Sequence, residues 1–173
     1  MKQTRSIGRN VKVTFDIEKL LAIRAEMKKR YRARVGVLGQ KNSRDSGEKG
    51  NADIGLAHEM GVLSRNLPRR SFLEMPLTLK MPEYAATFGA SLMKAIDSGN
   101  LKPAFITLGI KGEQVVQSAF ASGGFGVWPA LKLSTLYRKH PKGFSRFTKE
   151  HNDQILIDTG QLRRSITSDV VTK

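Results

Sequence analysis

The fold is decided by the stretch VKVTFDIEKLLAIRAEMKKRYRARVGVL, residues 11–38. Apolar and polar residues alternate over 11–15, which predicts a short strand. Asp16 is a good N-cap, and the apolar residues that follow it recur at helical spacing, which predicts an amphipathic helix over 16–30. Alternation returns over 31–38, with apolar side chains on one face and arginines on the other. Strand, helix and strand in this order are typical of the start of an α+β domain.

The rest of the chain extends this pattern with helices and one or two further strands. We predict a single α+β domain over residues 1–173, with a small, mostly antiparallel sheet and helices packed mainly on one face. A mobile loop is expected near 40–50, where QKNSRDSGEKG holds no apolar residue, and a basic excursion near 138–153. The further elements that we expect are helices at 52–60, 71–97 with a break, and 103–120, and strands at 165–171 and 155–157.

Composition excludes several classes of protein. The 173 residues include 30 Lys and Arg against 15 Asp and Glu, which gives a formal net charge of +15, and no cysteine. Disulfide scaffolds, thiol nucleophiles and cysteine-ligated metals are therefore excluded. No apolar run reaches the length of about 20 residues that a membrane span needs, so we expect no membrane partner and a protein of the reducing cytoplasm. The charge is concentrated in residues 1–50, where the net charge is +9.

Two short motifs suggest an enzyme, but neither is complete. His58 and Glu59 begin a zinc-protease pattern, which needs a second histidine where this chain has Val62. Asp158, Thr159 and Gly160 follow an apolar run as in an aspartic protease, but the motif occurs once and only 13 residues follow it. We interpret it as a turn capped by Asp158, with Gly160 giving the backbone freedom. The sequence thus predicts no enzyme, and no catalytic, cofactor or metal site.

Two basic clusters favour contact with a polyanion or an acidic protein. The second lies at 138–149 and is interleaved with aromatic residues, a composition typical of grooves that follow a nucleic-acid strand. Non-specific binding of nucleic acid through phosphate contacts is therefore an alternative function. For the first cluster we favour docking on an acidic protein, because two of its arginines share one strand face. This first cluster consists of Lys28, Lys29, Arg30, Arg32 and Arg34.

Two parts of the chain together resemble a family. The first comprises VGVLG at 35–39, NADIGLAHEMG at 51–61 and PRRSFL at 68–73; the second comprises WPALK at 128–132, STL at 134–136 and ILIDTGQLRRSI at 155–166. Their order is similar to that in the tail-completion and neck proteins of tailed bacteriophages, the virion-morphogenesis or minor tail protein family. The resemblance covers roughly residues 31–171.

The resemblance implies a structural virion protein that completes the tail or joins it to the head-side connector. The expected partners are the connector and the tail terminator or tube proteins, in a homo-oligomeric ring of six-fold symmetry with possible phosphate contact to genomic DNA. The expected location is the virion neck or upper tail, after assembly in the host cytoplasm. The resemblance also implies that the Arg69 and Arg70 charges are free for a neighbouring subunit. It implies structural roles for His58, Glu59, Gly61, Phe72, Trp128, Leu131, Thr135, Asp158, Thr159, Gly160, Leu162 and Ser165.

Overall fold

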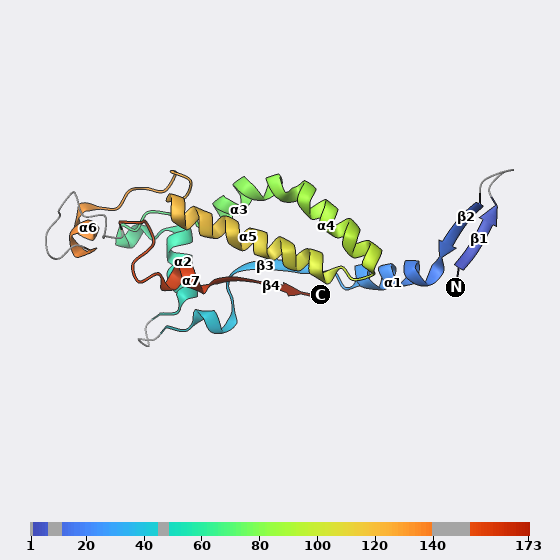
Figure 1. The fold of residues 1–173 in the computed structure, drawn as a ribbon. Coiled ribbons are helices and arrows are strands. Elements are labelled where there is room, and N and C mark those ends of the chain that lie inside the picture. The colour runs from blue at the N-terminus through green and yellow to red at the C-terminus, as the bar shows by residue number, and fades with distance from the viewer. Residues whose placement is uncertain (1, 7–11, 45–48, 140–152) are drawn as a thin grey trace.

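The computed structural model describes residues 2–6, 12–44, 49–139 and 153–173. It shows an α+β fold with a small antiparallel sheet, which confirms the predicted class (Figure 1). In chain order the elements are β1 (Lys2–Ser6), β2 (Lys12–Asp16), α1 (Ile17–Lys28), β3 (Arg32–Val37), η1 (Gly39–Asn42), α2 (Asn51–Met60), η2 (Leu63–Arg65), α3 (Glu74–Lys80), η3 (Met81–Tyr84), α4 (Ala85–Ser98), α5 (Lys102–Ser122), α6 (Leu133–Lys139), α7 (Gln161–Ser165) and β4 (Ile166–Val171).

The central sheet consists of β3 and β4, which pair antiparallel with Arg34 opposite Asp169. Exposure alternates along β3 from Arg32 to Val35 as predicted, because one face is covered by a helix. That helix is α5, which packs along both strands. A Cβ on Gly112 of α5 would lie 2.9 Å from a methyl carbon of Val35, so glycine at this position allows the helix to approach the sheet closely.

The main core lies under α5, at the end of the molecule that holds α2 and α7. Phe72 and Phe120 are 1% exposed, and their ring centroids are 5.2 Å apart. Trp128 meets Phe120 edge to face at 5.8 Å. A second, smaller cluster of Ala95, Leu101 and Ala104 joins α4 to α5. Aromatic contacts of this kind add to the stabilisation that apolar burial provides.

Residues 2–6 and 12–28 form what we call the N-terminal arm: the hairpin β1–β2 followed by α1. The strand predicted at 11–15 exists as β2, but it pairs with β1 and does not join the central sheet. Figure 1 shows the hairpin beyond the end of the central sheet, at the opposite end of the molecule from α6. Asp16 caps α1 as predicted and accepts a hydrogen bond from the Lys19 amide at 3.2 Å. None of the residues 17–28 of α1 is buried.

Several predicted boundaries change. The segment 155–157 is a turn and no strand, because Ile157 is buried in the main core while Leu156 has a left-handed backbone with φ 63°. The break expected within 71–97 is present, because the segment divides into α3, η3 and α4 with Pro82 near the start of η3, but its first helix begins at Glu74. The expected loop at 40–50 includes η1, and its residues 45–48 lie outside the described part of the chain. Most of the excursion at 138–153 also lies outside the described residues.

Candidate functional site

Glu59, at the end of α2, anchors the turn that leads into α3. Glu59 is 9% exposed, and its carboxylate accepts hydrogen bonds from the Ser71 hydroxyl at 2.5 Å, the Phe72 amide at 2.8 Å and the Leu73 and Glu74 amides at 3.0 Å. These amides form the start of α3, where a helix favours negative charge. Glu59 thus holds the segment 51–61 against the segment 68–73, and these hydrogen bonds are the physical basis of its expected structural role.

Arg70 has a structural role that the resemblance did not imply. It is 5% exposed, and its guanidinium donates to the Pro129 and Ala130 carbonyl oxygens, each at 3.0 Å. Burial lowers the pKa of Arg70. The expectation that its charge is free for a neighbouring subunit is wrong. Arg69 is more exposed, but it also has partners, the Glu59 carbonyl at 3.0 Å and the Glu74 carboxylate at 2.7 Å.

Trp128 connects the second part of the resemblance, at 128–166, to the first part, at 35–73. Its indole nitrogen donates to the Ser71 carbonyl at 2.9 Å, and its ring is 7% exposed. Together with the contacts of Arg70, this bond fixes the segment that follows α5 against the turn before α3. The two stretches that carry the resemblance are therefore neighbours in space, although nearly 60 residues separate Ser71 from Trp128.

A pocket of about 550 Å³ lies where these stretches meet. Its walls come from α2, the segment 65–70, the segment 131–139 that includes α6, and the turn 156–162 that leads into α7. Figure 1 shows α2, α6 and α7 at one end of the molecule, away from the N-terminal arm. The motif residues that line it are His58, Arg70, Leu131, Thr135, Asp158, Thr159, Gly160 and Leu162.

The turn at 158–160 differs from the predicted capped turn. Gly160 supplies the backbone freedom as expected, with φ 74°, and is itself the N-cap residue of α7. Asp158 makes no cap for that helix and is exposed. The Thr159 carbonyl accepts a hydrogen bond from the nearby Arg164 guanidinium at 3.1 Å. The Asp-Thr-Gly motif thus forms a wall of the pocket, with one carboxylate and no second aspartate among the residues that line it.

The remaining motif residues lie at the end of a helix, in the protein interior or beside the pocket. Gly61 ends α2 with φ 75°. Leu162 and Ser165 are buried, and the Ser165 hydroxyl donates to the Leu162 carbonyl at 2.7 Å. Leu131 and Thr135 are partly buried at the pocket and do not belong to the main core.

His58 supplies a half-buried imidazole to the pocket. Burial lowers the pKa of His58, and the nearby Arg70 guanidinium lowers it further, so the ring is neutral at pH 7. Its Nδ1 is buried and has no hydrogen-bond partner in the described part of the chain. Groups of three or more residues that could hold a metal ion do not occur among the described residues.

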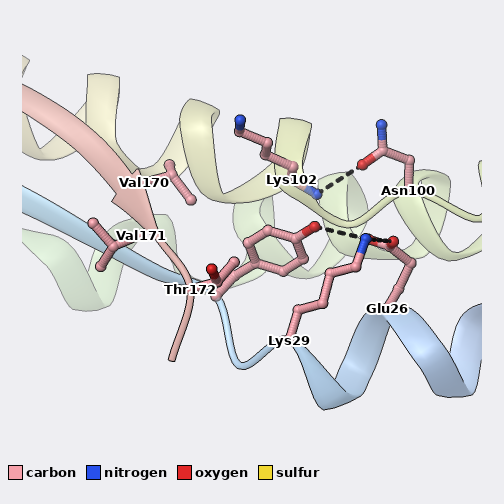
Figure 2. A pocket seen from close by; sticks show the side chains of 8 residues that line it. Glu26, Lys29, Asn100, Lys102, Val170, Val171 and Thr172 are labelled. Carbon is pink, nitrogen blue, oxygen red and sulfur yellow. Dashed lines mark hydrogen bonds and ion pairs between the residues drawn. The ribbon is translucent and has the colours of Figure 1, made fainter.

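The first basic cluster is only partly free. Figure 2 shows Lys29 meeting the Glu26 carboxylate beside an open hollow lined also by Asn100 and Lys102, and the Tyr31 hydroxyl donates to the same carboxylate at 2.9 Å. The hydrogen bonds from Lys29 and then Tyr31 lower the pKa of Glu26. Arg34 pairs across the sheet with Asp169, through bonds of 2.9 and 2.5 Å. The exposed members without such a partner in the described chain are Lys28, Arg30 and Arg32.

Some residues of the pocket could not be selected from the sequence. Arg44 and Arg65 belong to no periodic pattern, and Gln161 is part of a motif that indicates no contact with them, so only the fold brings the three together. Arg138 differs from these residues, because the sequence already indicates it as a member of the second basic cluster at 138–149.

No protein-family model, curated protein or solved structure matches this chain. Among the described residues, none of the helices is both long and apolar enough to cross a bilayer.

Proposed function

We propose that this protein is a structural component of the neck of a tailed bacteriophage virion, which completes the tail or joins it to the head-side connector as a ring. The observation that carries the proposal is the N-terminal arm. Along α1, Leu20, Leu21 and Met27 are 55%, 56% and 65% exposed, although large apolar side chains gain free energy when they leave water. An arm of this kind is typical of proteins whose assembly completes their burial.

The arm suits a head-to-tail ring. Rings use heterologous interfaces, in which one patch of a subunit meets a different patch of the next. Here the arm at one end of the molecule supplies the first patch (Figure 1). Exposed apolar side chains on α4 and α5 are candidates for the second patch, since Met93, Ile106 and Ile110 are 62%, 43% and 47% exposed. About half of each of these large side chains is still exposed, and burying that half contributes about 1 kcal/mol. Six-fold symmetry is the form that we propose.

The motif residues support a structural role over a catalytic one. Glu59, Arg70 and Trp128 are occupied by hydrogen bonds that hold turns in place. The charge distribution supports acidic protein partners, the connector and the tail terminator or tube proteins. Lys28, the last residue of the arm, and Arg32, just beyond it, are exposed and suit such a docking face, or a weaker contact with DNA phosphates.

The test combines charge reversal with particle assembly. The double variant Lys28→Glu with Arg32→Glu should yield heads and tails that fail to join. Its matched control, Lys49→Glu with Lys94→Glu, makes the same change of charge at exposed sites elsewhere and should leave joining unchanged. Joined, infectious particles at normal yield from the first variant would contradict the docking role of the cluster. Steep salt-dependent binding of the isolated protein to DNA, lost in that variant, would favour the nucleic-acid alternative.

A further inference from the structure

Three residues that each hold an unpaired buried polar atom lie around the pocket between α2, α6 and α7. Over the residues that the structure describes, the buried side-chain nitrogen and oxygen atoms without a hydrogen-bond partner are Arg44 Nε, His58 Nδ1 and Gln161 Oε1. All three residues line this one pocket. An unpaired buried polar atom is costly, and native proteins pair nearly all of them. Each atom is closed to solvent in this structure, so a ligand in the pocket reaches it only after the side chains around it shift.

The three atoms define what the ligand must carry. Arg44 Nε is a donor and Gln161 Oε1 is an acceptor, while the neutral imidazole of His58 can present Nδ1 as either. A complementary ligand therefore offers at least one N–H or O–H donor and one acceptor. A peptide main chain carries both at every residue.

The charge of the pocket selects an anion. Six basic side chains and one acidic side chain, Asp158, line it, which gives a net charge of +5. Lys132 donates to the Asn66 carbonyl and Lys139 to the Gln154 and Ile157 carbonyls, so these two are partly occupied. Arg65 and Arg138 are exposed and make no ion pair with any described residue. A carboxylate is a natural partner for such guanidinium groups.

The remaining walls are apolar. Ile54, Leu67, Leu131, Leu156 and Leu162 all line the pocket. Leu156 has a left-handed backbone with φ 63°, which a branched side chain rarely adopts. Strain of this kind is concentrated at functional sites. The pocket thus has room for an apolar side chain next to the charged group.

We propose that this pocket binds an acidic peptide segment of a partner protein, with an aspartate or glutamate beside a leucine- or isoleucine-type residue. The carboxylate meets the guanidinium groups of Arg65 and Arg138. Binding shifts the side chains that close off Arg44 Nε, His58 Nδ1 and Gln161 Oε1, and main-chain groups of the peptide then satisfy these atoms. The apolar side chain lies against the leucine-rich walls. A free phosphate fits less well, because it brings no apolar group and, when fully ionised, no donor for Gln161.

The N-terminal arm of a second copy is a poor occupant of the pocket. Residues 1–28 hold seven basic and three acidic side chains. Like charges would repel the arm from a pocket of net charge +5. The inference therefore concerns a different partner from the ring contact proposed above, and either can fail without the other.

The experiment selects peptide ligands from a random library, so the partner need not be identified first. A heptapeptide library is selected on the full-length protein, and enriched peptides are synthesised with matched Asp→Asn and Glu→Gln versions. Fluorescence anisotropy then measures their affinity. We expect enriched peptides to pair an acidic with a leucine-type residue, and the amide versions to bind about tenfold more weakly, as the loss of a charge-assisted hydrogen bond predicts.

Variants locate the binding in the pocket. Arg65→Glu with Arg138→Glu should weaken binding by about tenfold or more, and Gln161→Leu should weaken it measurably. The control Lys94→Glu with Lys111→Glu, which changes charge equally on α4 and α5, should leave the affinity within about twofold. Unfolding midpoints confirm that each variant is folded.

Several outcomes would overturn the proposal. These are a selection without enrichment, enriched peptides that lack acidic residues, and binding that the Arg65 and Arg138 changes leave intact. Inorganic phosphate that shifts the side-chain nuclear magnetic resonance signals of His58 and Gln161 as strongly as the peptide would assign the pocket to small anions. Displacement of the peptide by an oligonucleotide of equal affinity would assign it to nucleic acid.

Discussion

Large apolar side chains are buried in the main core but exposed in the N-terminal arm. In the core, Phe72, Phe120 and Trp128 are at most 7% exposed, and each contacts another ring or a backbone carbonyl. In the arm, Leu20 and Leu21 belong to a regular helix with a good N-cap, yet more than half of each side chain is exposed.

The difference separates what makes a helix from what stabilises a domain. Local signals such as the Asp16 cap are sufficient to start α1, but tertiary packing supplies most of the stability of helices in proteins. The arm touches the other elements through contacts such as the exposed pair Lys19–Asp97 at 3.4 Å, and such a pair contributes about 0–1 kcal/mol. The core is therefore expected to carry the stability, and the arm to carry assembly.

The largest expected effect comes from truncating a core aromatic. Phe72→Ala should lower the free energy of unfolding by about 3–5 kcal/mol, because it removes a fully buried ring and leaves a cavity. Leu21→Ala in the arm is the matched truncation and should change it by less than about 0.5 kcal/mol. Urea unfolding of both variants measures the difference. Equal losses would show that the arm is packed in solution.

The Glu59 carboxylate should be nearly as important as a core ring. Glu59→Gln keeps the size of the side chain but removes the charge that four donors share, so we expect a loss of about 2 kcal/mol. Glu74→Gln is the control, since Glu74 pairs with Arg69 at the surface, and should cost less than about 0.5 kcal/mol. Similar costs for both would mean that the buried network adds nothing to the stability of the core.

Two glycine substitutions should change the stability of the protein in opposite directions. Gly112→Ala puts a methyl group against Val35 where α5 meets the sheet and should destabilise the protein by about 1–3 kcal/mol. Gly89→Ala in α4 meets nothing within 4 Å and should stabilise by about 0.5–1 kcal/mol through helix propensity. Thermal unfolding checks both signs, and a neutral Gly112→Ala would indicate a looser contact between helix and sheet.

His58 should make the stability of the core depend on pH. Its folded-state pKa lies below the ordinary 6.5, mainly because it is buried, so the unfolded chain binds the proton more readily. The stabilisation is complete above pH 6.5 and is lost as the pH falls below it. His58→Gln should reduce the loss of stability between pH 7 and pH 5, as followed by urea unfolding. An identical pH profile in the variant would place the imidazole in water.

The smallest effect on stability should follow from removing the arm. A chain that lacks residues 1–28 loses a helix without buried residues, so its unfolding free energy should change by less than about 1 kcal/mol. The same shortened chain should fail in ring assembly. A large loss of cooperativity on urea unfolding would instead make the arm part of the folded unit.

The sequence predicts elements well where a local pattern reflects a half-buried face. The alternation over 31–38 predicts β3, because one side of that strand meets α5 and the other faces water. The partner of β2 could not be predicted in this way, because residues 2–6 read KQTRS and show no apolar alternation. The run at 155–157 is apolar because Ile157 enters the core, and a buried turn resembles a strand in sequence.

The candidate pocket was less accessible to sequence reasoning. The motifs identified His58, Asp158 and Leu162 in advance, but as structural residues and not as neighbours around one cavity. Gln161 and Arg44 become candidate site residues only because the fold buries a polar atom of each without a partner among the described residues. Burial depends on packing between distant segments, and a single sequence holds no local record of it.

The most direct test of the assembly role is a cryo-electron-microscopy map of the virion neck at side-chain resolution. We predict a ring in which α1 of each copy lies against the next copy, with Leu20, Leu21 and Met27 covered. A map in which α1 extends into solvent, or folds back on its own core, would contradict the assembly role, as would a neck that lacks this chain.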